Sequence, residues 1–292
     1  MKLVVSGTGE FYEGEPITKL LEVATLHDVQ HIDVWYPKNT KIKGLERSTD
    51  LIRESGLQVV CVSTWTHLYW PGDVSAQQSL LLEGIEVAHR LGASMVNTYF
   101  GHGPVQDDSL AIASYIEHLR PCLERAVARN VTLCLENEFD VLGDDPQASD
   151  ITRRPERIRE LLERVDSDHF RLTFDPCNFY FAGVEPFPFA YELLRDWIGY
   201  VHLKDGARYD PSRFADTVLR YTDHSGEYVC LPVGQGAINS EGLLSRLVTD
   251  GYTGYFALEP HVEEARVADT YAQTLAYLKK VAIQTPQGTD LG

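Results

Sequence analysis

Residues 131–139 read VTLCLENEF, an apolar run that ends in the acidic residue Glu136. Leu133 and Leu135 alternate with smaller or polar residues, and Glu136 falls on the opposite face from theirs. Because successive side chains of a β-strand point to opposite faces, the run predicts a strand with an apolar face and a face that carries a carboxylate. We expect the apolar face to pack on helices.

Three later runs repeat this pattern: FRLTFDPCN at 170–178, YVHLKDG at 200–206 and GYFALEPH at 254–261. In each run the bulky apolar residues share one face. The opposite face carries a residue that can bind a metal ion: Asp175, His202 and Glu259 respectively. Each of these residues lies near the C-terminal end of its strand, where the active sites of parallel β/α barrels form.

Strand-like runs alternate with amphipathic segments along the whole chain. The predicted strands are 2–6, 31–35, 58–63, 94–100, 131–136, 171–175, 200–204 and 255–259. This alternation is typical of parallel strands joined by crossover helices. Eight units predict an α/β fold, a single-domain (β/α)8 TIM barrel over residues 1–283, followed by a polar tail over 284–292. An open sheet would give the same alternation. The longest segment without a strand or helix periodicity is 206–236.

The length and net charge of the chain limit the classes of function that the protein can have. The 292 residues suit one barrel of roughly 250 residues, and a composition of 43% hydrophobic and 24% charged residues is ordinary for a globular protein. The net charge of −17 argues against nucleic acid as a partner, because such proteins present clustered Lys and Arg. No apolar stretch approaches the roughly 20 residues that span a bilayer, so we expect no membrane partner.

The five cysteines are widely spaced and form no CxxC pair. An odd number of scattered thiols fits a reducing compartment better than a disulfide framework. The short apolar run at the N-terminus turns polar after Gly7 and does not read as a secretory signal. We therefore expect a cytoplasmic protein.

Inward-facing charges on neighbouring strands repel one another and are costly to bury unless they are paired or bound to a metal. We therefore predict that the four in-phase residues share one divalent ion: Glu136, Asp175, His202 and Glu259. Three carboxylates and one imidazole form an oxygen-rich donor set, which suits Mn²⁺, Mg²⁺ or Co²⁺ better than a thiolate-rich zinc site does. Zn²⁺ remains an alternative.

Short motifs at the ends of these strands resemble those of the sugar-phosphate isomerase/epimerase-like (xylose isomerase-like) TIM barrels. They are LENE, FDPCN, VHLKD and LEPH, together with the Gly-rich turn VGQG. The resemblance covers essentially the whole chain in order and spacing. It implies a single divalent ion, often manganese, on the four residues named above. It also implies that Glu136 and Glu259 act as acid and base on opposite faces of a substrate carbon.

The activity implied by this resemblance is a metal-dependent sugar isomerase or epimerase. Such an enzyme abstracts a proton next to a carbonyl, and the metal stabilises the enediolate. A dehydratase or a C–O or C-glycoside lyase acting on a keto-sugar or inositol ketone would use the same site. A non-catalytic sugar-binding barrel is a further alternative. The expected partner is then a small sugar or sugar-derived molecule. Relatives are often dimers or tetramers, so a homo-oligomer is possible by analogy.

An apurinic endonuclease-type hydrolase is less favoured. Asn178 stands where those relatives carry a zinc-binding histidine, and where several epimerases carry a substrate-binding histidine. An asparagine can bond a substrate hydroxyl but cannot replace the imidazole as a zinc ligand. The segment after Glu136 also lacks a second glutamate at the position typical of the ketohexose epimerases.

Other polar residues are candidates for substrate binding. Arg208 lies six residues after His202, where the epimerases place an arginine that binds substrate oxygens. Lys204 is in phase with His202 and either contacts substrate or pairs with a site acid. Asp33 points inward if Val34 points outward, and we assign it no role.

An aromatic segment, residues 65–70, follows the third strand and is expected to line the barrel mouth. Trp65 and Trp70 would stack on a sugar ring or pack under a helix, and His67 lies between them. His102, in the sequence FGHGP after the fourth strand, either reaches the pocket or shapes the turn.

Overall fold

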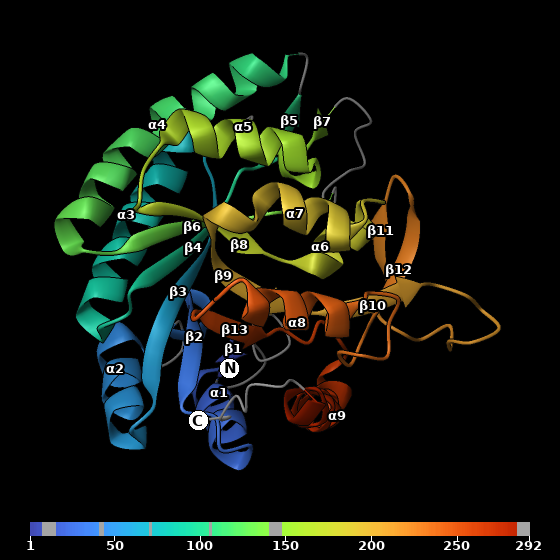
Figure 1. The fold of residues 1–292 in the computed structure, drawn as a ribbon. Helices are drawn as coiled ribbons and strands as arrows, with labels where there is room; N and C mark the ends of the chain where they lie inside the picture. Colours follow the sequence, from blue (N-terminus) through green and yellow to red (C-terminus); the bar gives the residue numbers. More distant parts are fainter. Residues whose placement is uncertain (8–15, 41–43, 70–71, 105–106, 140–147, 285–292) are drawn as a thin grey trace.

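The computed structural model describes residues 1–7, 16–40, 44–69, 72–104, 107–139 and 148–284. Eight parallel strands close into a barrel in the order β1-β13-β9-β8-β6-β4-β3-β2 (Figure 1). The barrel strands are β1 (Lys2–Ser6), β2 (His31–Tyr36), β3 (Gln58–His67), β4 (Met95–Tyr99), β6 (Thr132–Glu136), β8 (Phe170–Phe174), β9 (Ile198–Leu203) and β13 (Tyr255–Leu258). The predicted (β/α)8 barrel is confirmed, and the open sheet is excluded.

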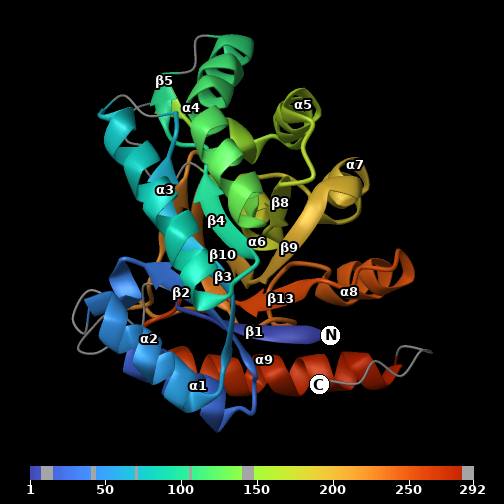
Figure 2. The same cartoon turned by 90° about the vertical axis from the view of Figure 1, so that its left-hand side faces the viewer.

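Helices lie around the outside of the barrel, as the two views together show (Figures 1 and 2). They are α1 (Pro16–Leu26), α2 (Gly44–Ser55), α3 (Val74–Leu91), α4 (Asp108–Arg129), α5 (Pro155–Val165), α6 (Pro176–Phe181), α7 (Tyr191–Leu194), α8 (Ser240–Thr249) and α9 (Glu264–Gln284). Short helical turns occupy Lys38–Thr40, Ile151–Arg153, Pro186–Ala190 and Arg195–Trp197. Among the described residues, no helix is both long and apolar enough to cross a membrane.

The alternation seen in the sequence separates two apolar regions. Leu133 and Leu135 are fully buried in the large cluster between the barrel and its helices. A smaller cluster fills the barrel itself and includes Cys134, Met95 and Tyr200. All five cysteines are buried free thiols. Much of the barrel interior is thus apolar, and the four predicted ligands lie at or near the C-terminal ends of their strands.

Two segments differ from the sequence prediction. Strand β3 runs four residues beyond the predicted end at Ser63, so Trp65 and His67 belong to the strand and not to a loop. The segment 206–236 is irregular only in part. Strands β10 (Asp205–Arg208), β11 (Tyr221–Asp223) and β12 (Gly226–Leu231) form an antiparallel sheet with β12 in the middle, which projects beside the barrel (Figure 1).

Two smaller features are a pair of short strands and the C-terminal end of helix α9. Strands β5 (Gly103–Pro104) and β7 (Ala148–Ser149) pair antiparallel. At the C-terminus, helix α9 includes Gln284, the first residue of the predicted tail, and the rest of that tail lies outside the described residues.

A buried carboxylate, Asp205, organises the turn that leads into α8. It accepts backbone N–H bonds from Gly206 at 2.8 Å, Gly234 at 2.9 Å, Gly236 at 3.2 Å and Ile238 at 3.3 Å. A Cβ on Gly236 would collide with this carboxylate, which explains the glycine there. Burial raises the pKa of Asp205, although these hydrogen bonds act in the opposite direction.

We expect Asp205→Asn to lower the free energy of unfolding by about 2–3 kcal/mol, because an amide cannot accept all four bonds and turns an NH₂ group towards N–H donors. Chemical denaturation followed by circular dichroism measures this. Asp210→Asn is the matched control, because Asp210 accepts the Ser212 N–H at 2.8 Å on an exposed loop, and its loss should leave the unfolding midpoint nearly unchanged. Equal midpoints for both variants would show that Asp205 does not hold the turn.

Candidate metal centre

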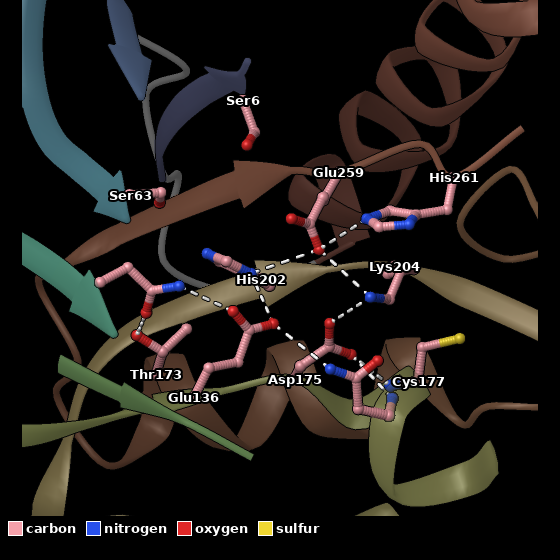
Figure 3. A network of polar contacts seen from close by, with 12 residues as sticks. Ser6, Ser63, Glu136, Thr173, Asp175, Cys177, His202, Lys204, Glu259 and His261 are labelled. Atoms are coloured by element: carbon pink, nitrogen blue, oxygen red, sulfur yellow. Dashed lines mark hydrogen bonds and ion pairs between the residues drawn. The ribbon is translucent and has the colours of Figure 1, made fainter. Parts of the chain in front are cut away.

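The four predicted ligands lie together at the C-terminal end of the barrel. Glu136 ends β6, His202 lies in β9, and Asp175 and Glu259 directly follow β8 and β13. Each offers one ligand atom, and these atoms all lie within 4.8 Å of one another. The four side chains point towards a common centre (Figure 3). All four residues are at most 2% exposed.

His202 lies between the two glutamates. Its Nδ1 atom is 3.0 Å from Oε1 of Glu136 and 3.3 Å from Oε2 of Glu259. Burial alone would lower the pKa of His202, but these two carboxylates raise it well above its usual value. One imidazole nitrogen is therefore the point at which the two acids converge.

Lys204 is the internal counter-ion of the cluster. Its Nζ atom is 2.8 Å from Oδ2 of Asp175 and 3.2 Å from Oε2 of Glu259 (Figure 3). Burial would lower the pKa of Lys204, but Asp175 and Glu259 raise it well above its usual value. Of the two roles considered for Lys204, the structure shows the ion pair with site acids.

The residues present fit a divalent ion. A histidine that binds a metal does so in its neutral form. Three carboxylates against one ammonium then leave two negative charges in excess, in a place that is almost inaccessible to water. A divalent ion would balance that excess. Its donors would be three carboxylate oxygens and one imidazole nitrogen, with no thiolate.

Two amide side chains hold Glu136, and one of them, Asn97, was not identified from the sequence. Asn97, on β4, donates from Nδ2 to Oε2 of Glu136 at 2.7 Å, and Thr173 donates to Oδ1 of Asn97 at 2.6 Å. Asn178 donates to Oε1 of Glu136 at 3.3 Å. The alternation along β4 was the available signal, because it places Asn97 on the inward face.

Asp175 is fixed from two sides. Its Oδ1 accepts the backbone N–H groups of Cys177 and Asn178 at 2.7 and 3.0 Å, so it caps the first turn of α6. The side chain of Asn137 bonds both the N–H and the C=O of Asp175, each at 2.8 Å. The ligand cannot rotate away without breaking these bonds.

Asp33 points into the barrel interior, as the alternation on its strand indicated. It is fully buried, and its Oδ2 accepts from Ser63 at 2.9 Å and from Tyr200 at 3.3 Å. Burial raises the pKa of Asp33 to about 7. Tyr200 also packs edge-on against the ring of His202, with the ring centroids 5.0 Å apart. Asp33 thus supports the strand that carries His202.

A hollow opens from the cluster towards solvent. Its aromatic lining consists of Trp35, Trp65, Tyr99, Phe139, Phe181 and Tyr221. Of the predicted binding residues, Trp65, Asn178 and Lys204 border it, together with both glutamates.

Two further polar residues in this hollow were missed, Glu138 and His261. Burial and the neighbouring Glu136 raise the pKa of Glu138 well above its usual value. The Nε2 atom of His261 is 3.3 Å from Oε2 of Glu259. Each lies two residues after a ligand, on the same face of an extended chain, so the period-two pattern could have found both.

His67 and His102 do not border the hollow. The ring of His67 packs edge-on against Trp65, with the centroids 4.8 Å apart. Burial, with a smaller contribution from His102, lowers the pKa of His67 to about 4. His102 is also buried. Both therefore lie behind the aromatic lining. Trp70 falls outside the described residues.

The structure does not bring Arg208 to the cluster. Its guanidinium lies 5.7 Å from the ring centroid of Tyr228 and donates to the carbonyl of Ser225. It borders a second hollow, shared with Tyr180 and Phe187. The physical reason is β10, which pairs with β12 and turns the chain away from the barrel axis directly after the ligand strand. The predicted contact of Arg208 with a metal-bound substrate has no support in this placement.

Comparisons with known proteins agree with this architecture. Residues 21–281 match the family described as xylose isomerase-like TIM barrel. A curated relative, the 2-epi-5-epi-valiolone 7-phosphate 2-epimerase of Actinoplanes sp., is 29% identical over 129 residues. That alignment spans 44% of this chain and 43% of the relative, so less than half of either protein is matched.

Two solved structures share the fold along nearly the whole chain. A xylose isomerase domain protein from Planctomyces limnophilus has a TM-score of 0.76 at 16% identity, covering 97% of this chain and 98% of that one. The IOLI protein, solved with a zinc atom, has a TM-score of 0.74 at 16% identity, covering 98% and 100%. Identities this low show the fold alone. The family match, in contrast, spans most of the sequence, and the chain belongs to the xylose isomerase-like TIM-barrel family.

Proposed function

We propose that this protein is a divalent-metal-dependent isomerase or epimerase of a sugar or related polyol ketone. One observation carries the proposal. Two buried glutamates approach a single imidazole nitrogen, at 3.0 and 3.3 Å, within a cluster that can hold one ion. Two carboxylates beside one centre supply an acid and a base for one substrate carbon.

Glu136, Asp175, His202 and Glu259 would hold the ion, with Mn²⁺ as our proposed metal. When bound, the ion would supply Lewis-acid stabilisation of negative charge on substrate oxygens. The epimerase activity in the name of the Actinoplanes relative supports this class of reaction. The buried free thiols support a reducing compartment, and we propose a cytoplasmic location.

The two glutamates would then divide the proton transfers. One takes a proton from the carbon next to the substrate carbonyl, and the other returns a proton to the opposite face of that carbon, which inverts it. Lys204 holds the Glu259 carboxylate in place at 3.2 Å, and Asn97 and Asn178 each hold one oxygen of Glu136. Both carboxylates are therefore oriented before substrate arrives.

We expect carefully loaded protein to contain about one divalent ion per chain, and added Mn²⁺ to raise the melting temperature because the ion binds only the folded state. His202→Ala should lose most of the metal and this stabilisation. His89→Ala, on the exposed face of α3, is the matched control and should keep both. Elemental analysis and thermal melting measure these outcomes. Two or three tightly bound zinc ions per chain would contradict the proposal and favour an endonuclease-type site.

We expect Glu136→Gln and Glu259→Gln each to slow exchange of a substrate carbon-bound proton with solvent deuterium by about 10²–10⁴-fold, because an amide accepts no proton. Proton NMR of Mn²⁺-loaded protein in heavy water, with a panel of ketoses and inositol ketones, measures this exchange. Glu156→Gln, on the exposed face of α5, should exchange at the wild-type rate.

The products of the same incubations separate the reaction types. Retention of all substrate carbon and oxygen atoms with a changed stereocentre or carbonyl position supports an isomerase or epimerase. Release of water or of an aglycone would instead identify a lyase that uses the same proton abstraction. A Gln variant with near-normal exchange would remove that glutamate from the proton transfers.

A further inference from the structure

Two groups of aromatic side chains line the hollow above the metal cluster. The first group, which we call the first wall, consists of Trp35, Trp65 and Tyr99, from the neighbouring strands β2, β3 and β4. The Trp65 and Tyr99 rings are 4.6 Å apart between centroids, and Trp35 stacks on Trp65 at 6.2 Å. These contacts make one continuous apolar surface.

The second wall consists of Phe139, Phe181 and Tyr221. Their ring centroids are 5.3 Å apart for Phe139 and Phe181 and 6.2 Å for the stacked pair Phe181 and Tyr221. Tyr221 is also 3.4 Å from His261 through its hydroxyl. This wall is therefore built as a packed unit, like the first.

The two walls adjoin at the neighbouring strands β4 and β6 and extend around the barrel from β2 to β9. In the strand order, β3 and β9 are four strands apart in both directions around the ring, so they lie on opposite sides. The first wall is centred on β3. The second comes from the segments after β6, β8 and β9, with Tyr221 in the sheet that follows β9. The hollow, which we call the slot, is thus bordered by aromatic side chains along six consecutive strands, with Trp65 and Tyr221 coming from opposite sides of the barrel and the metal cluster below.

The charged groups of the slot are mostly acidic. Among the described lining residues, Glu136, Glu138 and Glu259 are carboxylates, and Lys204 is the sole lysine or arginine. Lys204 is already paired with Asp175 at 2.8 Å and with Glu259 at 3.2 Å. A phosphate in this slot would meet carboxylates without a guanidinium to bind it.

We propose that the substrate is a sugar or cyclitol without a phosphate that carries a flat apolar substituent, such as an aromatic ring. This inference rests on the proposed function, because the hydroxylated ring would bind at the metal and leave the slot to the substituent. Stacking on these aromatic surfaces would contribute affinity that a small substituent cannot obtain.

Calorimetric titration of the Mn²⁺-loaded protein with matched glycosides tests this substrate class. The probes are the phenyl and methyl β-glycosides of glucose, galactose and mannose, together with the corresponding hexose 6-phosphates. We expect the phenyl member to bind about tenfold more tightly than the methyl member, which corresponds to one well-stacked ring. The hexose phosphates should bind more weakly than the methyl glycosides.

Variants of the two walls show whether the slot is the origin of this preference. Trp65→Leu and Tyr221→Leu should reduce the ratio of phenyl to methyl affinity by about fivefold or more while the metal content stays unchanged. Tyr209→Leu is the matched control, because Tyr209 lies in the same connecting segment as Tyr221 but bonds Asp216 and does not border the hollow. If a variant lost affinity equally for the phenyl and the methyl glycoside, the substituted aromatic residue would have a merely structural role.

Several outcomes would overturn the proposal. They are equal affinity for the phenyl and methyl members, tighter binding of the phosphates, or no binding of any phenyl glycoside. Failure of the proposed function looks different. If the phenyl preference is present but Glu136→Gln and Glu259→Gln retain exchange, the substrate class stands and the proton-transfer roles fail. If exchange needs both glutamates but the phenyl preference is absent, the proton-transfer roles stand and the substrate class fails.

Discussion

Repulsion between buried carboxylates is the constraint on which the rest of this structure depends. Glu136, Asp175 and Glu259 converge within a few ångströms where almost no water enters, and the loss of hydration makes each charge expensive. Lys204 offsets part of this repulsion through its contacts with Asp175 and Glu259. An arrangement of this kind is stable only if every carboxylate has a fixed direction and a cation completes the balance.

The fold provides those directions from elements that are far apart in the sequence. The asparagine of β4 orients Glu136, the first turn of α6 orients Asp175, and β9 places the imidazole between the two glutamates. The strands that carry these ligands are consecutive neighbours in the barrel, in the order β13-β9-β8-β6, and the curvature of the closed ring turns their ends towards a common centre. The apolar packing of the outer helices therefore determines the geometry of the polar centre.

The sequence predicted the barrel and the grouping of the four ligands because both depend on local periodicity. An alternating strand fixes which side chains face inward, and the parallel β/α arrangement brings the strand ends together. The same rule, extended two residues past each ligand, reaches Glu138 and His261, which the analysis overlooked. Arg208 was misplaced for a different reason. Its position depends on the pairing of β10 with β12, two strands separated by a long connection, and no local pattern specifies such a pairing.

The charge balance of the site also limits what it can bind beside a metal. With an ion in place, its two positive charges and that of Lys204 oppose the three ligand carboxylates, so that the centre is close to neutral. Glu138 adds a further carboxyl group to the hollow, and burial together with Glu136 raises its pKa well above the usual value. Neutral hydroxyl and carbonyl oxygens can approach such a centre without repulsion, whereas a dianionic phosphate cannot. The aromatic walls add a preference for apolar surface, which they attract. The acidity that makes this site suitable for a metal therefore also favours the uncharged partner that we propose for it.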